Sequence, residues 1–344
     1  EDDMTIRLIE SGGDIRLKGR QNIYSAAVGN EAALKGQDLI IEAARGSIGS
    51  LARAMVIDIG QYNLTARAGQ DIYISSPAHS LHIDTIYAAG HVDLRTEHSL
   101  LNSTNPNQNI RAESLHLEAK NGGIGSSERF FKIGLDPSGQ LTAQARGDIF
   151  INSPVRSLNT GGITSEGDIT IIGGDSVHVS STSGGINTLF GRVLIDARNS
   201  ILSLDRAAGA GITAQNIYLE TQNGAIGSME NDLRINTLSQ GRFAADAVGG
   251  IYVSETEGDL DVEFVTSAEG NISLTALGGD VLLETADAQG DVNVHSLTGN
   301  VHLQTVSSRA GSVSLTSQGS ATAGTIDAHG DVSVDSLTGN VLLD

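Results

Sequence analysis

The stretch AQGDVNVHSLTGNVHLQ, residues 288–304, decides the fold, because it returns almost unchanged as AHGDVSVDSLTGNVLLD, residues 328–344. Each copy contains two short runs in which a glycine and a small polar residue precede two aliphatic residues separated by one residue. Apolar residues at every second position lie on one face of an extended strand. Each copy therefore predicts two short β-strands.

The same run recurs throughout the last third of the chain in two interleaved series. The leading glycines are Gly250, Gly270, Gly290, Gly311 and Gly330 in one series, and Gly258, Gly279, Gly299, Gly319 and Gly339 in the other. Each series repeats every 19–21 residues. A strand this short buries its apolar face only when a copy of itself stacks on it. We therefore predict an all-β fold, a right-handed parallel β-helix (β-solenoid), with the hand that parallel crossovers prefer. The glycines should admit a left-handed or crowded backbone at the corners.

Stacking of the coils predicts which aliphatic residues form columns in the core. The first strand series should contribute Ile251, Ile272, Val292, Val313 and Val332, with Val253, Leu274, Val294, Leu315 and Val334 beside them. The second should contribute Leu260, Val281, Val301, Ala321 and Val341, with Val262, Leu283, Leu303, Ala323 and Leu343. Ala321 and Ala323 form a weak rung, where the column should narrow or the pairing slip.

The first two thirds carry the same signal with longer intervals. Strands should start near Asp14, Asp38, Asp71, His91, Ser114, Asp148, Asp168, Arg192, Asn216 and Gly250. Three intervals are 33 or 34 residues long and contain RGSIGS (45–50), NGGIGS (121–126) and NGAIGS (223–228). Each is followed by an apolar pair: Met55/Ile57, Phe131/Ile133 and Leu233/Ile235. We interpret each as a long coil with an additional strand, or with a loop and a strand. The count predicts roughly fourteen coils of about 20–24 residues with three longer ones.

The composition is compatible with one solenoid domain over residues 1–344. Residues 1–249 would form longer coils with the three IGS insertions, and residues 250–344 regular acidic coils of about 20 residues. The net charge is −20, and residues 250–344 contain 14 acidic residues and a single basic one, Arg309. Such a field repels nucleic acid and anionic membrane surfaces, so we expect neither nucleic-acid binding nor direct membrane insertion. There is no cysteine, which excludes a disulfide framework.

The candidate chemical sites are weak. The only adjacent pair of aspartates is Asp2–Asp3, which argues against the paired-carboxylate hydrolases that also use this fold. Calcium between Asp259 and Asp280 is an alternative to a purely solvating role, but Asn and Ser interrupt the Asp columns. His79 and His82 in HSLH, and His295 and His302, are interpreted as surface residues. One of Phe130 and Phe131 should be core, and the other should cap the insertion. We therefore expect no enzyme activity, no cofactor and no catalytic, cofactor-binding or metal-binding residues.

The tandem G-[DN]-[VIL]-x-[VIL] strands and segments of the type IYLETQNGAIGSMENDLRI (217–235) resemble the filamentous-haemagglutinin-like exoproteins and giant adhesins of bacteria. The resemblance covers nearly the whole chain, and its IGS unit is more specific than its strand motif. It implies a right-handed parallel β-helix exported to the bacterial cell surface. The secretion domain of that family is not recognised here, so the segment is similar to the family's shaft.

The expected function is a structural shaft segment of a secreted or surface-anchored bacterial adhesin or extracellular filament. A polysaccharide- or cell-binding β-helix module is the alternative, and a carbohydrate-active enzyme is a third. We expect the partners to be neighbouring solenoid segments of a longer parent chain or end-to-end copies, because neither end of the sequence shows a cap. Cell-surface polysaccharide or another cell is the other expected partner. The expected location is extracellular, at the cell surface.

Overall fold

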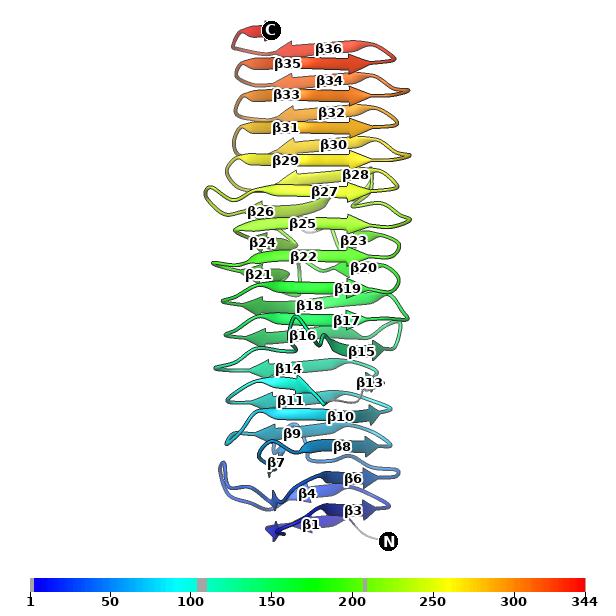
Figure 1. Cartoon of the computed structure of the whole chain (residues 1–344), viewed down its shortest axis with the longest axis vertical. Coiled ribbons are helices and arrows are strands. Elements are labelled where there is room, and N and C mark those ends of the chain that lie inside the picture. Colours follow the sequence, from blue (N-terminus) through cyan, green and yellow to red (C-terminus); the bar gives the residue numbers. More distant parts are fainter. Residues whose placement is uncertain (1–2, 104–109, 207–208, 344) are drawn as a thin grey trace. The chain divides into compact units, whose positions relative to one another are not determined.

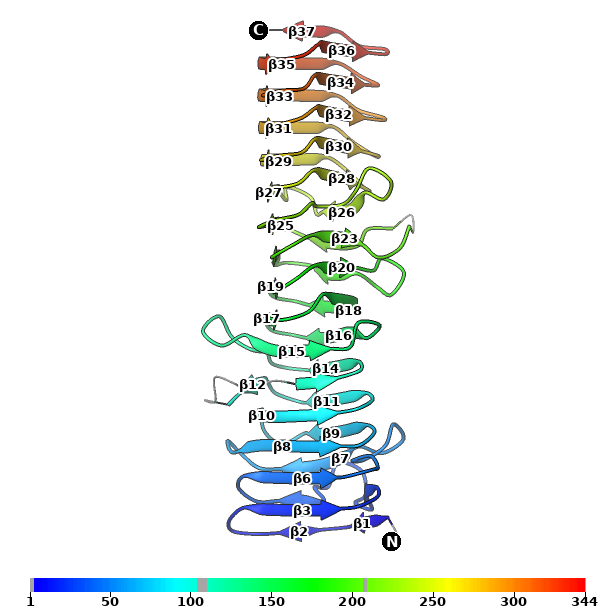
Figure 2. The same ribbon diagram turned by 90° about the vertical axis from the view of Figure 1, so that its right-hand side faces the viewer.

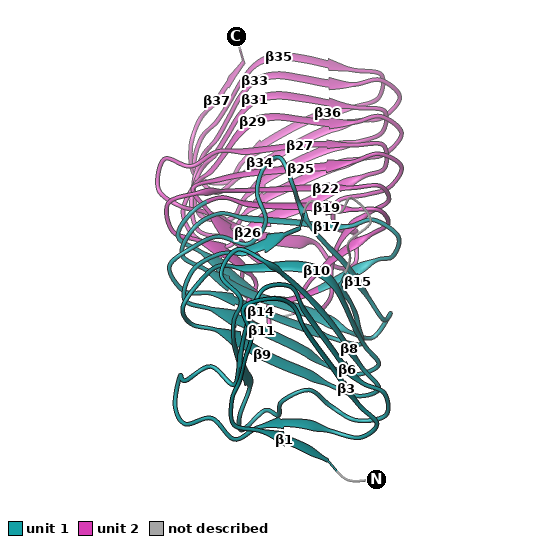
Figure 3. Cartoon of the chain, turned by 60° about the horizontal axis from the view of Figure 1, so that its bottom comes forward, with its two compact units in different colours: residues 1–159, 163–167 teal, residues 160–162, 168–344 magenta. Residues whose placement is uncertain are grey.

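A computed structural model describes residues 3–103, 110–206 and 209–343. The chain divides into two compact units, which Figure 3 colours separately. Unit 1 comprises residues 1–159 and 163–167, and unit 2 comprises residues 160–162 and 168–344. Every regular element among the described residues is a β-strand, and the predicted class, an all-β parallel β-helix, is confirmed.

Each unit contains two parallel sheets, named here sheet I and sheet II, whose strands alternate along the chain. Sheet I of unit 1 contains β2 (Ile9–Glu10), β5 (Leu34–Lys35), β7 (Met55–Asp58), β9 (Ile72–Ser76), β11 (Val92–Thr96), β14 (Leu115–Ala119) and β16 (Gln140–Ala145). On the same side, β1 (Met4–Ile6) and β4 (Ile23–Ser25) form a two-stranded sheet, which isolated bridges from Ile23 to Ile48 and from Ile48 to Ile72 connect to sheet I. Sheet II of unit 1 contains β3 (Ile15–Gly19), β6 (Leu39–Ala43), β8 (Asn63–Ala68), β10 (Leu81–Ala88), β12 (Leu100–Asn102), β13 (Ile110–Ala112), β15 (Phe131–Leu135) and β17 (Ile149–Ser153). β18 (Leu158–Ser165) contains residues of both units.

The strands of unit 2 follow the same order. Its sheet I contains β20 (Val177–Val179), β21 (Ile186–Thr188), β23 (Ile201–Ser203), β24 (Ile212–Ala214), β26 (Leu233–Thr237), β28 (Ile251–Glu255), β30 (Ile272–Ala276), β32 (Val292–Ser296), β34 (Val313–Ser317) and β36 (Val332–Ser336). Its sheet II contains β19 (Ile169–Gly173), β22 (Arg192–Ala197), β25 (Asn216–Thr221), β27 (Phe243–Ala247), β29 (Leu260–Ser267), β31 (Val281–Ala288), β33 (Val301–Ser308), β35 (Ala321–Ala328) and β37 (Val341–Leu343).

The predicted pairing of the columns of unit 2 is confirmed throughout, and the columns are buried up to Val313 and Leu315 in sheet I and Ala321 and Ala323 in sheet II, whereas Val332, Val341 and Leu343 of the last coil are exposed. Ile251 pairs with Ile272, then Val292, Val313 and Val332 in sheet I, while Leu260 pairs with Val281, then Val301, Ala321 and Val341 in sheet II. Figure 1 shows these strands stacked in sequence order. The pairing does not slip at Ala321 and Ala323, which are fully buried and keep the register of their neighbours.

The predicted number of coils was too low, since the strands make about 16 turns. The three long intervals explain the error. Strand starts near Asp38 and Asp71 belong to different sheets, because β6 lies in sheet II and β9 in sheet I. The starts near Ser114 and Asp148, and those near Asn216 and Gly250, change sheet in the same way. Each long interval is therefore about one and a half ordinary coils, not one enlarged coil.

Small polar residues at the start of the strands, most of them directly after a leading glycine, accept a hydrogen bond from the backbone of the next coil. Asp259 Oδ1 accepts a hydrogen bond from the backbone N–H of Asp280 at 2.8 Å, and Asp280 Oδ1 accepts one from the N–H of Asn300 at 2.7 Å. Asn300 Oδ1 continues the column to the N–H of Ser320 at 2.8 Å. The same bond recurs in unit 1, where Asp71 Oδ1 accepts from the N–H of His91 at 2.8 Å. Asp, Asn and Ser interchange along these columns because each supplies an oxygen acceptor.

This side-chain ladder also explains the glycines. A Cβ on Gly299 would lie 2.2 Å from Asp280 Oδ1, and one on Gly290 would lie 2.0 Å from Asn271 Oδ1. Among the ten leading glycines of unit 2, only Gly258 has a positive φ, 78°. The expected crowding is therefore confirmed, whereas a left-handed backbone is the exception.

The serine of the repeated SLTGNV closes the corner between two coils. Ser296 is fully buried, its hydroxyl donates to the carbonyl of Gly279 at 2.6 Å, and it accepts from the N–H of Gly299 at 2.9 Å. Ser336 makes the same two bonds with Gly319 and Gly339. The serine, glycine, asparagine and valine of the repeat thus recur because each satisfies a backbone or packing requirement of the corner, whereas Leu297 and Leu337 are exposed.

Candidate functional site: grooves beside the insertion loops

The three IGS insertions are loops that leave a strand and return to it. Ile48 and Met55 occupy the places that face Ile72 and Ile74 of the next coil, so residues 49–54 replace a single outward residue. Residues 125–130 and 227–232 do the same: Ile124 and Phe131 face Ile149 and Ile151, and Ile226 and Leu233 face Ile251 and Val253. Of the two interpretations of the long intervals, a loop and a strand is confirmed, because each interval contains a loop followed by the strand that carries the apolar pair, β7, β15 or β26. Figure 2 shows the loop before β15 standing out from the strands.

The sequence IGS determines the start of each loop. The N–H of Gly49 continues the backbone ladder to the carbonyl of Ile23 at 2.8 Å. Gly49 has a φ of 68°, and a Cβ there would lie 2.4 Å from the carbonyl oxygen of Tyr73. Ser50 and Arg53 then exchange two backbone hydrogen bonds, at 2.9 and 3.0 Å, which close the loop. The loops at 125–130 and 227–232 repeat all three features through Gly125 and Gly227, with closures Ser126–Arg129 and Ser228–Asn231.

Each loop forms one side of a groove on the outer face of a sheet. The first groove, of about 370 Å³, is bounded by loop residues 50–54 and by strands β9 and β11 of sheet I. The third groove, of about 430 Å³, is bounded by residues of the 227–232 loop and by β28, β30 and β32 of the corresponding sheet in unit 2. The second groove, of about 380 Å³, lies on sheet II of unit 1 between the 125–130 loop and β8, β10 and β12.

The first groove is charged. Asp93 is 4% exposed although it faces outward, and Arg95 covers its carboxylate with two bonds, Nε to Oδ1 at 2.8 Å and Nη2 to Oδ2 at 2.6 Å. The hydrogen bond to Asp93 raises the pKa of Arg95. Tyr73 lies beside Asp93 in the register of β9 and β11, and burial raises the pKa of its phenol. The floor therefore presents a neutralised ion pair next to an aromatic ring.

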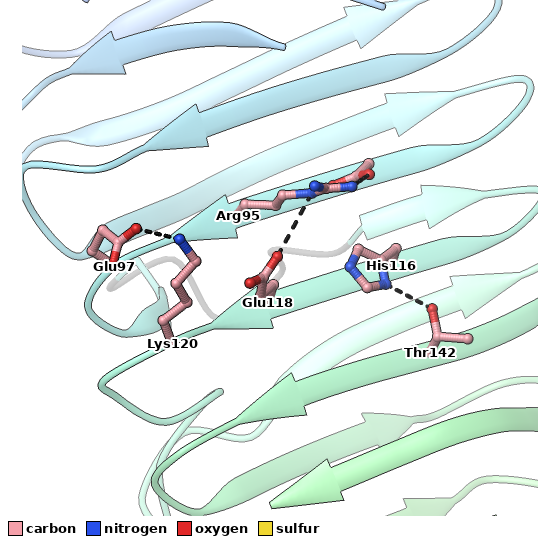
Figure 4. Close-up of polar contacts among 7 residues, drawn as sticks. Arg95, Glu97, His116, Glu118, Lys120 and Thr142 are labelled. Carbon is pink, nitrogen blue, oxygen red and sulfur yellow. Dashed lines mark hydrogen bonds and ion pairs between the residues drawn. The ribbon is translucent and has the colours of Figure 1, made fainter. Parts of the chain in front are cut away.

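The charged face continues on β14. Arg95 Nε lies 3.8 Å from Glu118 Oε2, and Lys120 pairs with Glu97, as Figure 4 shows. His116 lies 2.9 Å from the hydroxyl of Thr142 through Nδ1. Burial lowers the pKa of His116, so its imidazole is neutral at pH 7.

The third groove has the same framework and a different chemistry. Tyr252 takes the place of Tyr73 above the loop, and Ser273 and Thr275 take the places of Asp93 and Arg95 in the next coil. Asn293, which lines the third groove, has the register position that His116 has beside Asp93. The tip residues Leu51 and Met229 are 77% and 76% exposed. The same loop therefore borders an ion pair on the next coil in the first groove, Asp93 with Arg95, and an ion pair next to the loop itself in the third, where Arg234 Nε lies 3.9 Å from Asp232 Oδ2.

The residues singled out in the sequence do not come together at one site. Asp259 and Asp280 are occupied by the side-chain ladder, and among the described residues no group of three or more His, Cys, Asp or Glu side chains could hold a metal ion. Asp3 is exposed and accepts from Asn22, while Asp2 lies outside the described residues. His295 and His302 point outward, as expected.

The structure also places the aromatic and histidine residues singled out in the sequence. Phe131 is fully buried, and Phe130 packs edge-on against Phe150 with ring centroids 5.5 Å apart, as expected. His79 is exposed and lies 2.9 Å from Asp58 Oδ1 through Nδ1. His82 lies on the outer face, as expected, but it is half-buried in the second groove, where its Nδ1 is buried.

One titratable residue of the core, Glu255, was not predicted from the sequence. Glu255 ends β28 at an inward position, is fully buried, and stands where Ala276 and Ser296 stand in the coils above. Its Oε2 accepts from the N–H and the hydroxyl of Thr237 at 2.9 and 2.8 Å. Burial raises the pKa of its carboxyl to about 7. The sequence carried a signal, since Glu255 replaces a small residue in the series that otherwise ends each strand.

Comparisons with known proteins identify no relative: no family model, no curated protein and no solved structure matches the chain. Within the part of the chain that the structure describes, no helix has the length and apolarity needed to cross a membrane. The resemblance to filamentous-haemagglutinin-like exoproteins thus stays a prediction.

Proposed function

We propose that this chain is a structural shaft segment of a secreted or surface-anchored bacterial adhesin or extracellular filament. The observation that carries the proposal is the unbroken register of unit 2 from Ile251 to Val332 and from Leu260 to Val341. Every coil there is joined to the next by strand hydrogen bonds, by an aliphatic column and by a side-chain ladder. Such a stack resists bending because a bend breaks several of these bonds in the same coil.

The outer surface supports the same function. The outward positions of β32 and β34 are Asn293, His295, Ser314 and Thr316, which are short or polar and make no apolar patch. The acidic charge of the last third also opposes lateral association between copies. A segment built to space other parts of a protein needs a rigid interior and an unreactive exterior.

Distance measurements between spin labels test this proposal directly. The chain has no cysteine, so Glu269→Cys and His329→Cys place two labels at equivalent corners of unit 2. Each inserted copy of residues 270–289 should add one coil and lengthen the distance by about 4.8 Å, with a narrow distribution. A broad distribution, or a distance that does not grow with the number of coils, contradicts the shaft.

A further inference from the structure

The second groove differs from the other two in containing polar atoms without partners. His82 Nδ1 and Asn102 Oδ1 are buried and have no hydrogen-bond partner among the described residues. No side chain that lines the first or third groove has such an atom. Buried polar atoms in folded proteins are nearly always paired with protein, water or ligand, since an unpaired one costs free energy. These two atoms therefore indicate a missing hydrogen-bonding group in the groove.

The local structure holds both residues in place. Asn102 Nδ2 donates to the carbonyl of Phe130 at 2.5 Å, so the 125–130 loop fixes the amide and leaves its oxygen for another donor. His82 lies between Asn63 and Leu101 in the register of β8, β10 and β12. The three side chains form one outward column, which is the floor of the groove.

The lining indicates the chemical class of the ligand. Gln61 and Asn63 add amides that donate and accept, and Ser126 adds a hydroxyl. Glu128 and Arg129 have opposite charges, which offset each other. Leu101 supplies an apolar surface beside His82. A ligand that fits has no net charge, many hydroxyls that both donate and accept, and a face of C–H groups, which is the description of a sugar ring.

We propose that the second groove binds a neutral saccharide, whose hydroxyls pair with His82 Nδ1 and Asn102 Oδ1. The groove volume of about 380 Å³ lies in the range of small-molecule sites, about 300–1,000 Å³. This site is independent of the shaft function, because a rigid segment serves as a spacer with or without a ligand on its face.

Ligand-observed NMR on the full chain tests the proposal. The probes are the methyl glycosides of glucose, galactose, mannose and N-acetylglucosamine and their disaccharides, with inorganic sulfate as an anionic comparison. At least one neutral sugar should bind saturably, and His82→Leu should weaken its binding about tenfold, the effect of losing one or two hydrogen bonds. Gln61→Ala, at an exposed position, should also weaken binding and serves if the first variant misfolds.

The control is His302→Leu, the same change at the same outward place of a sheet II strand, at a residue that lines none of the three grooves. It should leave binding unchanged. Binding by none of the sugars overturns the proposal and leaves ordered water as the partner of both atoms. Equal affinity of the His82→Leu variant and the parent, or stronger binding of sulfate than of any sugar, overturns it as well.

Discussion

The first and third grooves have the same loop and the same tyrosine above it, yet Asp93 and Arg95 in one correspond to Ser273 and Thr275 in the other. The shared part faces the core or the backbone ladder, where Ile48 and Ile226, like Gly49 and Gly227, meet identical requirements. The differing part faces solvent, where the fold demands little. The comparison teaches that the insertion is a structural module and that its surface chemistry varies independently.

The glycines of the loops should show the largest effect, and it should be equal in both grooves. Gly49→Ala and Gly227→Ala place a Cβ 2.4 and 2.2 Å from a carbonyl oxygen at a φ near 68°. We expect each to lower the free energy of unfolding by about 3 kcal/mol, because the clash adds to left-handed strain. Gly60→Ala is the control, since its φ is 55° but its Cβ meets nothing, and it should cost about 1 kcal/mol. Urea unfolding measures all three. Similar losses at Gly49 and Gly60 would contradict this account.

The second prediction concerns Glu255, which belongs to the coil of the third groove and has no counterpart in the first. Its folded pKa of about 7 lies above the ordinary value of 4.5, so the folded state binds the proton more tightly. Its contribution to stability is therefore complete below pH 4.5 and is lost as the pH rises to 7 and beyond. We expect a loss of about 3 kcal/mol across this range, at about 1.4 kcal/mol per pH unit.

The variant Glu255→Gln isolates this effect from other titrating groups. Its free energy of unfolding should vary less between pH 4.5 and pH 7.5 than that of the parent protein. The exposed neighbour change Glu257→Gln should keep the parent's pH dependence. If both variants and the parent give parallel stability curves, Glu255 does not titrate in this range.

The ion pair of the first groove provides a smaller test. Arg95→Ala leaves the Asp93 carboxylate nearly buried without its two hydrogen bonds. We expect it to lower the free energy of unfolding by about 1–2 kcal/mol, since Arg95 itself is half exposed and its charge is screened. The matched change Thr275→Ala in the third groove should cost less than about 0.5 kcal/mol. Equal costs would mean that the charged pair adds nothing to the shared framework.

The last prediction is that a calcium chelator does not change the thermal stability of the chain. Asp259 and Asp280 each use an oxygen for a backbone N–H of the next coil, as Asp71 does in unit 1. Thermal melts of the chain with and without a chelator should therefore superimpose. Asp280→Asn should also be tolerated, because an amide oxygen accepts the same bond from Asn300. A lower melting temperature in the chelator would instead assign these aspartates to calcium.

The sequence by itself determined the strands, the two-sheet coil and the buried columns, because alternation of apolar residues is a local pattern that one strand displays. It also located all three insertions and predicted that one of Phe130 and Phe131 is a core residue, which the structure shows to be Phe131. It did not determine the number of coils, because strands of sheet I and sheet II have the same apolar pattern. The strand near Asp38 belongs to sheet II and the strand near Asp71 to sheet I, a change that the pattern does not reveal.

Only the tertiary structure decided what lies beside what on the outer faces. From the sequence, Asp280 could be a solvated or a metal-binding residue. The structure shows instead that its Oδ1 accepts a hydrogen bond from the N–H of Asn300 at 2.7 Å. The sequence places His82 on the surface, but only the structure shows that the 125–130 loop makes that surface a groove. These neighbours come from coils about 20–45 residues apart, and their positions depend on the lateral register. The physical reason is that burial constrains the inward residues of every coil, whereas outward residues gain their chemistry only from the coils stacked next to them.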